Sequence, residues 1–297
     1  MGKELAENFP VARQVFEEAD DALGFSISRL CFEGPAEELQ LTENTQPAIL
    51  TVSVAAFRVM TENGVGAPAF VAGHSLGEYS ALVAVGALQL YDAVRTVRAR
   101  GRYMQAAVPI GTGAMAAVMG AELNAIQRVC EEAAQGQVCS IANINSPNQI
   151  VIAGNAEAID RAIEMLQGIA KRAIKLNVSA PFHCALMKPA QERLEPDLAK
   201  LVFNEPSAPV VTNVDARVTT APDELRDALV RQVSAPVRWV ESMQLLIQQG
   251  VETFIEAGPG KVLTGLMRQI NRDVRMMNVE NAASLQATTE TVLAAGN

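Results

Sequence analysis

The sequence predicts an α/β protein in which a ferredoxin-like unit interrupts a larger α/β domain. Two observations predict this class. An apolar run at 69–72 leads into the motif G-H-S-L-G at 73–77 and then into a helical stretch, which is the strand–turn–helix context of a nucleophile elbow. Further along, residues 112–179 follow the order β-α-β-β-α-β, which is the ferredoxin-like order.

The first third of the chain is predicted to be largely helical. Apolar residues recur at helical spacing over 3–23, where Gly24 ends the pattern. A second helix is expected over 47–63, since Pro47 suits a first helical turn and a glycine follows the last periodic residue. An arginine-rich segment at 90–107 predicts the helix that follows the elbow region.

The ferredoxin-like unit is expected to span 112–179, and 1–111 and 180–297 are expected to form the larger domain. After the unit, the pattern returns to alternating strands and helices. The strands expected in the unit lie at 114–119, 138–144, 149–153 and 172–178, and its helices at 123–134 and 156–167. Later strands are expected near 209–213 and 251–255, and helices near 185–201, 223–233 and 239–249.

Composition excludes several classes of protein. The chain has 297 residues, of which 49% are hydrophobic, and this is enough to bury a large core. A net charge of −9 disfavours nucleic acid or an anionic membrane as the main partner. No run approaches the roughly 18 apolar residues of a spanning helix, and the first nine residues are not a secretory signal. We therefore expect a cytoplasmic protein.

The cysteines and histidines give no indication of a metal site or a cofactor. The four cysteines lack C-x-x-C spacing and have no histidine at zinc-ligand spacing. They are instead typical of small buried hydrophobic residues in a reducing compartment. They are Cys31, Cys130, Cys139 and Cys184.

Ser75 is the candidate nucleophile, because it occupies the centre of the elbow motif. A serine hydroxyl needs a histidine to accept its proton, and the chain contains only two. His74 adjoins the serine on a sharp turn, so its side chain points away from that of Ser75. His183 is therefore the candidate base, although a single histidine can also be an ordinary surface or capping residue.

Six blocks in the same order and spacing resemble the malonyl-CoA:acyl-carrier-protein transacylases of fatty-acid biosynthesis. They are GHSLGEYSA at 73–81, RGRYMQ at 100–105, GTGAM at 111–115, APFH at 180–183, VRQ at 230–232 and EAGPGK at 256–261. The resemblance covers essentially the whole chain. It implies an α/β-hydrolase-like core with an inserted ferredoxin-like subdomain, and transfer of a malonyl group from malonyl-CoA to the phosphopantetheine thiol of acyl carrier protein by a ping-pong mechanism.

The resemblance also implies a role for each matching residue. Ser75 resembles the nucleophile that forms the acyl-enzyme, and His183 the general base, oriented by the main-chain carbonyl of Gln232. Arg100 resembles the arginine that holds the malonyl carboxylate, for which a planar guanidinium is suited. Composition alone would make it one of several solvated helix arginines. Leu76 resembles the residue whose main-chain N–H is one oxyanion donor.

Three further residues match positions near the family's pocket. Phe182 resembles the bulky residue of members that select malonyl over methylmalonyl groups. His74, next to the nucleophile, is expected to line the pocket. Gln46 lies in a family motif near the pocket, and helix capping is an equally good interpretation of it.

The family's second oxyanion donor lies in a glutamine-rich loop after its first strand. This chain begins at Met1-Gly2, downstream of that strand and loop. A lost oxyanion donor reduces the rate about a hundredfold or more, and a lost strand exposes an apolar sheet edge. We therefore expect the chain to be weakly active or poorly soluble beside a version extended at its amino terminus.

Two other classes of protein remain open. A serine esterase or thioesterase would share the elbow but would place a carboxylate between the serine and a late histidine, and it would leave Arg100 without a purpose. An inactive truncated homologue would not acylate Ser75 at all. Incubation with malonyl-CoA distinguishes the three, because a transacylase holds the acyl group for a thiol whereas a hydrolase releases free acid.

Overall fold

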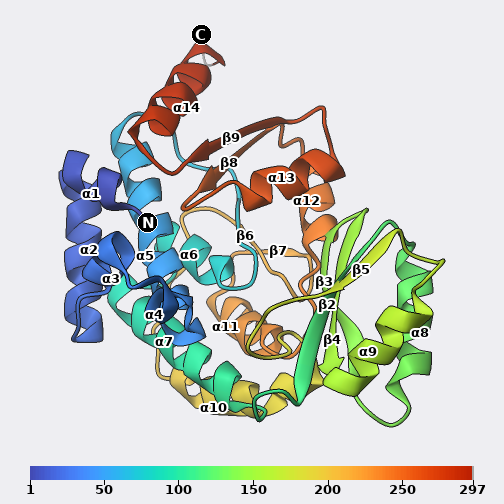
Figure 1. Ribbon diagram of the computed structural model, residues 1–297. Helices are drawn as coiled ribbons and strands as arrows, with labels where there is room; N and C mark the ends of the chain where they lie inside the picture. Colours follow the sequence, from blue (N-terminus) through green and yellow to red (C-terminus); the bar gives the residue numbers. More distant parts are fainter. Residues whose placement is uncertain (296–297) are drawn as a thin grey trace.

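The computed structural model describes residues 1–295 and shows a mixed α/β molecule (Figure 1). The amino-terminal third forms a helical layer around α5 (Thr42–Glu62). The other helices of this layer are α1 (Lys3–Asn8), α2 (Pro10–Leu23), α3 (Ile27–Glu33), α4 (Ala36–Gln40) and α7 (Leu90–Ala106). Among residues 1–295, no helix combines the length and the apolar character needed to cross a membrane.

Two of the predicted helices differ from the structure at a proline. The first predicted helix is divided at Phe9, which is extended because Pro10 begins α2 and a proline disfavours helical backbone in the residue before it. The second begins more than one turn upstream of Pro47, because two amides ahead of the proline donate to the Leu41 carbonyl, each at 2.8 Å. Pro47 is thus inside α5 and does not start it.

Two small sheets are built from strands outside residues 112–179. In the first, β1 (Val71–Ala72) runs parallel to β6 (Val210–Val211), which pairs antiparallel with β7 (Val218–Thr219). In the second, β8 (Thr253–Ala257) runs parallel to β9 (Arg275–Val279). The α-helices outside both the helical layer and residues 112–179 are α6 (Gly77–Ala84), α10 (Lys188–Ala199), α11 (Pro222–Gln232), α12 (Trp239–Gln248), α13 (Val262–Ile270) and α14 (Ala282–Ala295).

A four-stranded antiparallel sheet in the order β3-β4-β2-β5 confirms the ferredoxin-like prediction. It lies on the opposite side of the molecule from the helical layer (Figure 1). Its last strand stops at Lys175, short of the predicted end. Its elements are β2 (Gly113–Met119), α8 (Leu123–Ala134), β3 (Cys139–Ser146), β4 (Gln149–Asn155), α9 (Ala156–Met165) and β5 (Arg172–Lys175).

The two faces of this sheet are buried against different parts of the chain. One face packs on α8 and α9 through a buried cluster that includes Val118 and Ile152. The other face presents Met115 and Val151 to Cys184 and its neighbours. The sheet therefore supports the loop that carries His183.

Close packing of α7 against α5 depends on Gly101. A Cβ at this position would lie 2.7 Å from the Thr42 carbonyl oxygen and 2.8 Å from the Glu43 Cα, closer than real Cβ atoms approach backbone. Only glycine lets the two helices meet here. The contact lies one residue from Arg100, so it brings that side chain from α7 next to Gln46 of α5.

Candidate active site

Ser75 lies on a tight turn between β1 and α6. Its φ of 52° is in the left-handed region, which is unusual for a residue with a side chain and is typical of a strained functional turn. A Cβ on Gly73 would lie 1.9 Å from the main chain of Gly77, so the turn closes only with glycine there. Asn213 braces the turn, because its Oδ1 accepts from the Ser75 amide and its Nδ2 donates to the Gly73 carbonyl, both at 2.6 Å.

His183 is buried, and its ring bridges Ser75 and Gln232. Its Nε2 is 2.7 Å from the Ser75 Oγ, and its Nδ1 is 2.9 Å from the Gln232 carbonyl oxygen. A carbonyl can only accept, so Nδ1 carries the ring hydrogen and Nε2 keeps its lone pair toward the serine hydroxyl. The ring is thus oriented to take the hydroxyl proton.

The surroundings of His183 keep the imidazole neutral. Burial is the main cause that lowers its pKa to about 3, and the nearby guanidinium of Arg100 adds to the effect. The hydrogen bond to the Gln232 carbonyl acts in the opposite direction but is weaker. At neutral pH the free ring can therefore accept a proton.

Arg100 places a buried guanidinium beside the serine, with only 2% of the residue exposed. Its Nη1 donates to the Gln46 Oε1 at 2.7 Å, and its Nη2 donates to the Gln232 Oε1 at 2.9 Å and to the Ser75 Oγ at 3.0 Å. These partners are all neutral. No ion pair forms on this guanidinium among residues 1–295, which leaves a buried positive charge available for an anionic ligand.

Gln232 connects the groups of the site. Its main-chain carbonyl binds His183, and its side chain donates from Nε2 to the Ser75 carbonyl at 3.0 Å and to the Glu78 Oε2 at 2.8 Å. The same side chain accepts from Arg100. A single residue at the end of α11 therefore contacts the serine, the histidine and the arginine.

Sequence reasoning missed two members of this cluster, Glu78 and Asn213. Glu78 is fully buried, and burial is the main cause that raises its pKa to about 7. The main-chain amide of Asn213 donates to the Glu78 Oε2 at 3.0 Å. Glu78 stands within the matched elbow block and could have been noticed there. Asn213 has no local signal, because it meets Ser75 only through a contact between distant segments.

The other predicted site residues lie around the elbow. Leu76 is the amino-terminal cap of α6, and its amide donates to no acceptor within residues 1–295. Phe182 is half-buried against the core beside the histidine loop. The His74 Nε2 lies 2.8 Å from the Asn145 Oδ1 of β3, and burial lowers the pKa of this ring. His74 therefore joins the ferredoxin-like unit and does not contact the serine hydroxyl.

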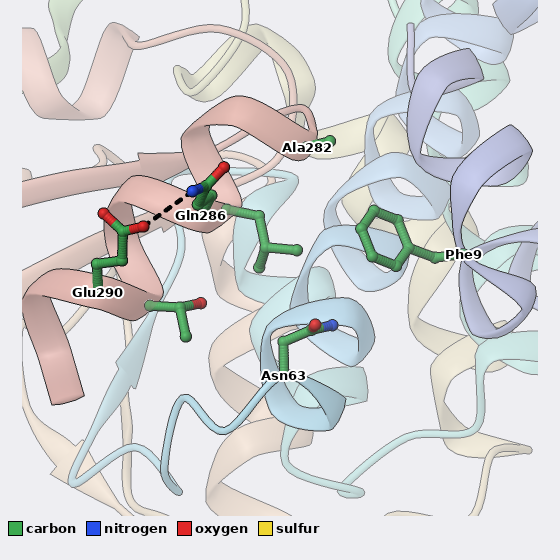
Figure 2. Close-up of a pocket in the computed structure, with 7 residues that line it drawn as sticks. Phe9, Asn63, Ala282, Gln286 and Glu290 are labelled. Carbon is green, nitrogen blue, oxygen red and sulfur yellow. Dashed lines mark hydrogen bonds between the residues drawn. The ribbon is translucent and has the colours of Figure 1, made fainter.

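One cavity reaches the elbow around Ser75, and another lies apart from it. An apolar groove of about 790 Å³ runs along β1 and β8 and reaches Gly73, His74 and Leu76. A smaller pocket of about 280 Å³ lies between α14 and Phe9 (Figure 2), and it shares no residue with the Ser75 cluster. Within residues 1–295, no group of three histidine, cysteine or acidic side chains could hold a metal ion.

An elbow serine in contact with a buried histidine, on an α/β-hydrolase-like core, is the arrangement of enzymes that transfer acyl groups through a serine ester. The acyl transferase domain family matches residues 1–292 of the chain. The protein is therefore an acyltransferase.

Comparison with individual proteins shows which family of acyltransferases the chain resembles. The malonyl CoA-acyl carrier protein transacylase of Escherichia coli K12 is 51% identical over 288 residues, which cover 97% of this chain and 93% of the relative. That of Bacillus subtilis is 47% identical over 294 residues, covering 98% and 92%. The chain belongs to the malonyl CoA-acyl carrier protein transacylase family.

Solved structures agree with this assignment. The acyl carrier protein S-malonyltransferase of Vibrio cholerae superposes with a TM-score of 0.95 at 49% identity, covering 97% of this chain and 94% of that one. A malonyl-transacylase in complex with a type II PKS acyl-carrier protein has a TM-score of 0.95 at 48% identity, covering 98% and 94%. The α/β-hydrolase-like core with an inserted ferredoxin-like subdomain is confirmed.

Proposed function

We propose that this chain transfers the malonyl group of malonyl-CoA to the phosphopantetheine thiol of acyl carrier protein, through an ester on Ser75. The observation that carries the proposal is the buried guanidinium of Arg100, whose Nη2 lies 3.0 Å from the Ser75 Oγ. A neutral acyl group gives no reason to bury such a charge beside the nucleophile. A carboxylate at the far end of a short acyl group does.

In the first half-reaction, the Ser75 Oγ attacks the thioester carbonyl carbon while its proton moves to the His183 Nε2. The amide of Leu76 donates to the oxygen that becomes negative. The carbon–sulfur bond then breaks, and the departing thiolate of coenzyme A takes the proton from the imidazolium. The malonyl group remains as an ester on Ser75.

Binding of the malonyl carboxylate also makes His183 easier to protonate. In the free protein, the positive charge of Arg100 helps to lower the pKa of His183. A carboxylate against the guanidinium offsets that charge, so the imidazolium that forms during attack is easier to reach. The neutral carbonyl of Gln232 orients the ring but stabilises its charge less than a carboxylate would.

In the second half-reaction, the phosphopantetheine thiol replaces coenzyme A. It gives its proton to His183, and its sulfur attacks the ester carbon. The bond from that carbon to the Ser75 Oγ breaks, and the serine oxygen recovers its proton from the imidazolium. Both half-reactions use the same groups, which is why a ping-pong mechanism suits the site.

The larger domain (1–111 and 180–297) carries this chemistry in our proposal, and the unit at 112–179 supports the histidine loop. We also place the enzyme in the cytoplasm, where malonyl-CoA and acyl carrier protein would meet it. This rests on the sequence features described above.

Incubation with malonyl-CoA tests the proposal. Intact-mass and peptide analysis should find a malonyl ester on Ser75 together with stoichiometric release of coenzyme A, and a pantetheine thiol should discharge the ester. A serine thioesterase would release malonic acid in water without a thiol. An absence of label on Ser75 would favour an inactive homologue and refute the proposal.

A further inference from the structure

Glu78 carries a fully buried carboxylate behind the candidate nucleophile. It is the second residue of α6, and its Oε2 accepts from the Gln232 Nε2 at 2.8 Å and from the Asn213 amide at 3.0 Å. Its Oε1 has no hydrogen-bond partner among residues 1–295. Burial of an ionisable group with so few compensating contacts is costly, so packing alone does not explain it.

Both residues that hydrogen-bond to the Glu78 carboxylate also hydrogen-bond to the candidate reacting groups. Gln232 holds the Nη2 of Arg100 with its Oε1 and the Ser75 carbonyl with its Nε2. Asn213 holds the Ser75 amide with its Oδ1. Glu78 is therefore one hydrogen bond away from the supports of both the nucleophile and the guanidinium.

The Glu78 carboxylate, the Arg100 guanidinium and the Ser75 carbonyl together determine which way the Gln232 amide points. With a negative charge on one side and the guanidinium of Arg100 on the other, the NH₂ group faces Glu78 and the oxygen faces the arginine. The flipped amide would set NH₂ against the guanidinium and oxygen against the carboxylate, and both contacts repel. The observed hydrogen bonds match the first orientation.

We propose that Glu78 is a positioning residue for malonyl transfer, which acts by fixing the Gln232 amide in the orientation that holds Arg100 beside Ser75. This proposal rests on the function proposed above. Loss of the charge, by protonation or by substitution with glutamine, weakens one of the two hydrogen bonds that the Gln232 NH₂ group donates and leaves the one to the Ser75 carbonyl. The glutamine oxygen that faces Arg100 is then held less firmly.

The charged groups around Glu78 are few. The guanidinium of Arg100 on α7 favours its ionised form, whereas the carboxylate of Asp215, in the segment after β6, opposes it. The phenol of Tyr79, next to it on α6, stays protonated because burial raises its pKa. With burial dominant, the pKa of Glu78 lies at about 7, so a modest change in pH alters its charge. The neutral ring of His183 does not titrate in this range.

The test compares the full chain with Glu78→Gln, and with Ser80→Ala as a matched control on the same helix. The Ser80 hydroxyl has no hydrogen-bond partner among residues 1–295, so its loss breaks no hydrogen bond there. Release of coenzyme A in a single turnover is measured with malonyl-CoA and with acetyl-CoA, from about pH 5.5 to about pH 8.5. Thermal unfolding is recorded for each variant.

We expect the wild-type malonyl rate to fall about tenfold as the pH decreases through 7, and the acetyl rate to fall less. Glu78→Gln should have a flat malonyl profile at the low-pH level of the wild type, while Ser80→Ala should follow the wild type. A Glu78→Gln rate within about twofold of wild type at about pH 8, or an unchanged pH profile in this variant, overturns the proposal.

Two outcomes separate this proposal from the function on which it rests. A wild-type protein that neither releases coenzyme A nor acquires label on Ser75 overturns both. An active wild type with an unaffected Glu78→Gln overturns only the role of Glu78. If Glu78→Gln does not fold, the wild-type profile decides, because a malonyl-to-acetyl rate ratio that is constant with pH contradicts the proposal.

Discussion

Substitution of Arg100 by alanine should selectively abolish the preference for a carboxylated acyl group. A guanidinium and a carboxylate form two parallel charge-assisted hydrogen bonds, worth together about 3–6 kcal/mol. The bound carboxylate displaces the 3.0 Å hydrogen bond from Nη2 to the Ser75 Oγ, which offsets about 1 kcal/mol. The difference of about 2–5 kcal/mol corresponds to a malonyl rate lower by about thirtyfold to several thousandfold.

Single-turnover release of coenzyme A from malonyl-CoA and from acetyl-CoA measures this effect. The acetyl group has no carboxylate, so its rate should not fall with that of malonyl. Arg100→Lys keeps the charge but cannot form the paired hydrogen bonds, and it should lie between the wild type and Arg100→Ala. Arg95→Ala is the matched control, because Arg95 is an exposed residue of α7 whose one side-chain hydrogen bond within residues 1–295 goes to Tyr91.

The ratio of the two rates decides the outcome. A malonyl-to-acetyl ratio in Arg100→Ala equal to that of the wild type would remove the guanidinium from acyl recognition. An equal fall of both rates would assign Arg100 to support of the Ser75 hydroxyl alone. Either result refutes the reasoning from the buried charge.

Four further predictions concern the elbow and its surroundings. Ser75→Ala should abolish the acyl-enzyme in mass analysis, and His183→Asn should lower the acylation rate by about 10²- to 10⁴-fold. Gly73→Ala should lower the thermal midpoint and prevent acylation, because its Cβ would lie 1.9 Å from the main chain of Gly77. Glu78→Gln should raise the free energy of unfolding at about pH 8 by up to about 3 kcal/mol, measured by urea denaturation.

The sign of the last effect follows from the pKa of Glu78, which folding raises from 4.5 to about 7. A raised pKa contributes stability that is fully present below about pH 4.5 and is lost as the pH rises through about 7. Glutamine avoids the cost of a buried charge at higher pH. Equal or lower stability of Glu78→Gln at about pH 8 would contradict this reasoning. Acylation of His183→Asn or of Gly73→Ala at the wild-type rate would likewise contradict the assigned geometry.

Much of the fold could be predicted because its signals are local. The apolar run and glycines around Ser75 are sufficient to indicate a strand, a tight turn and a helix. The order of strands and helices over 112–179 follows from the spacing of its apolar residues. The strand β9 (Arg275–Val279) was not predicted, since it carries no clear alternation and exists by pairing with β8. Likewise β1 is only two residues long, because its length depends on its pairing with β6.

For the site, local sequence patterns were enough to name the candidate reacting groups. A single elbow serine and a choice between two histidines left Ser75 and His183 as the candidate pair, and the matched blocks added Arg100. The bracing of the elbow by Asn213 and the burial of Glu78 behind it follow from the folded chain and have no local sequence signal. These contacts join residues more than a hundred positions apart, and pKa values depend on burial, so neither can be derived from local patterns.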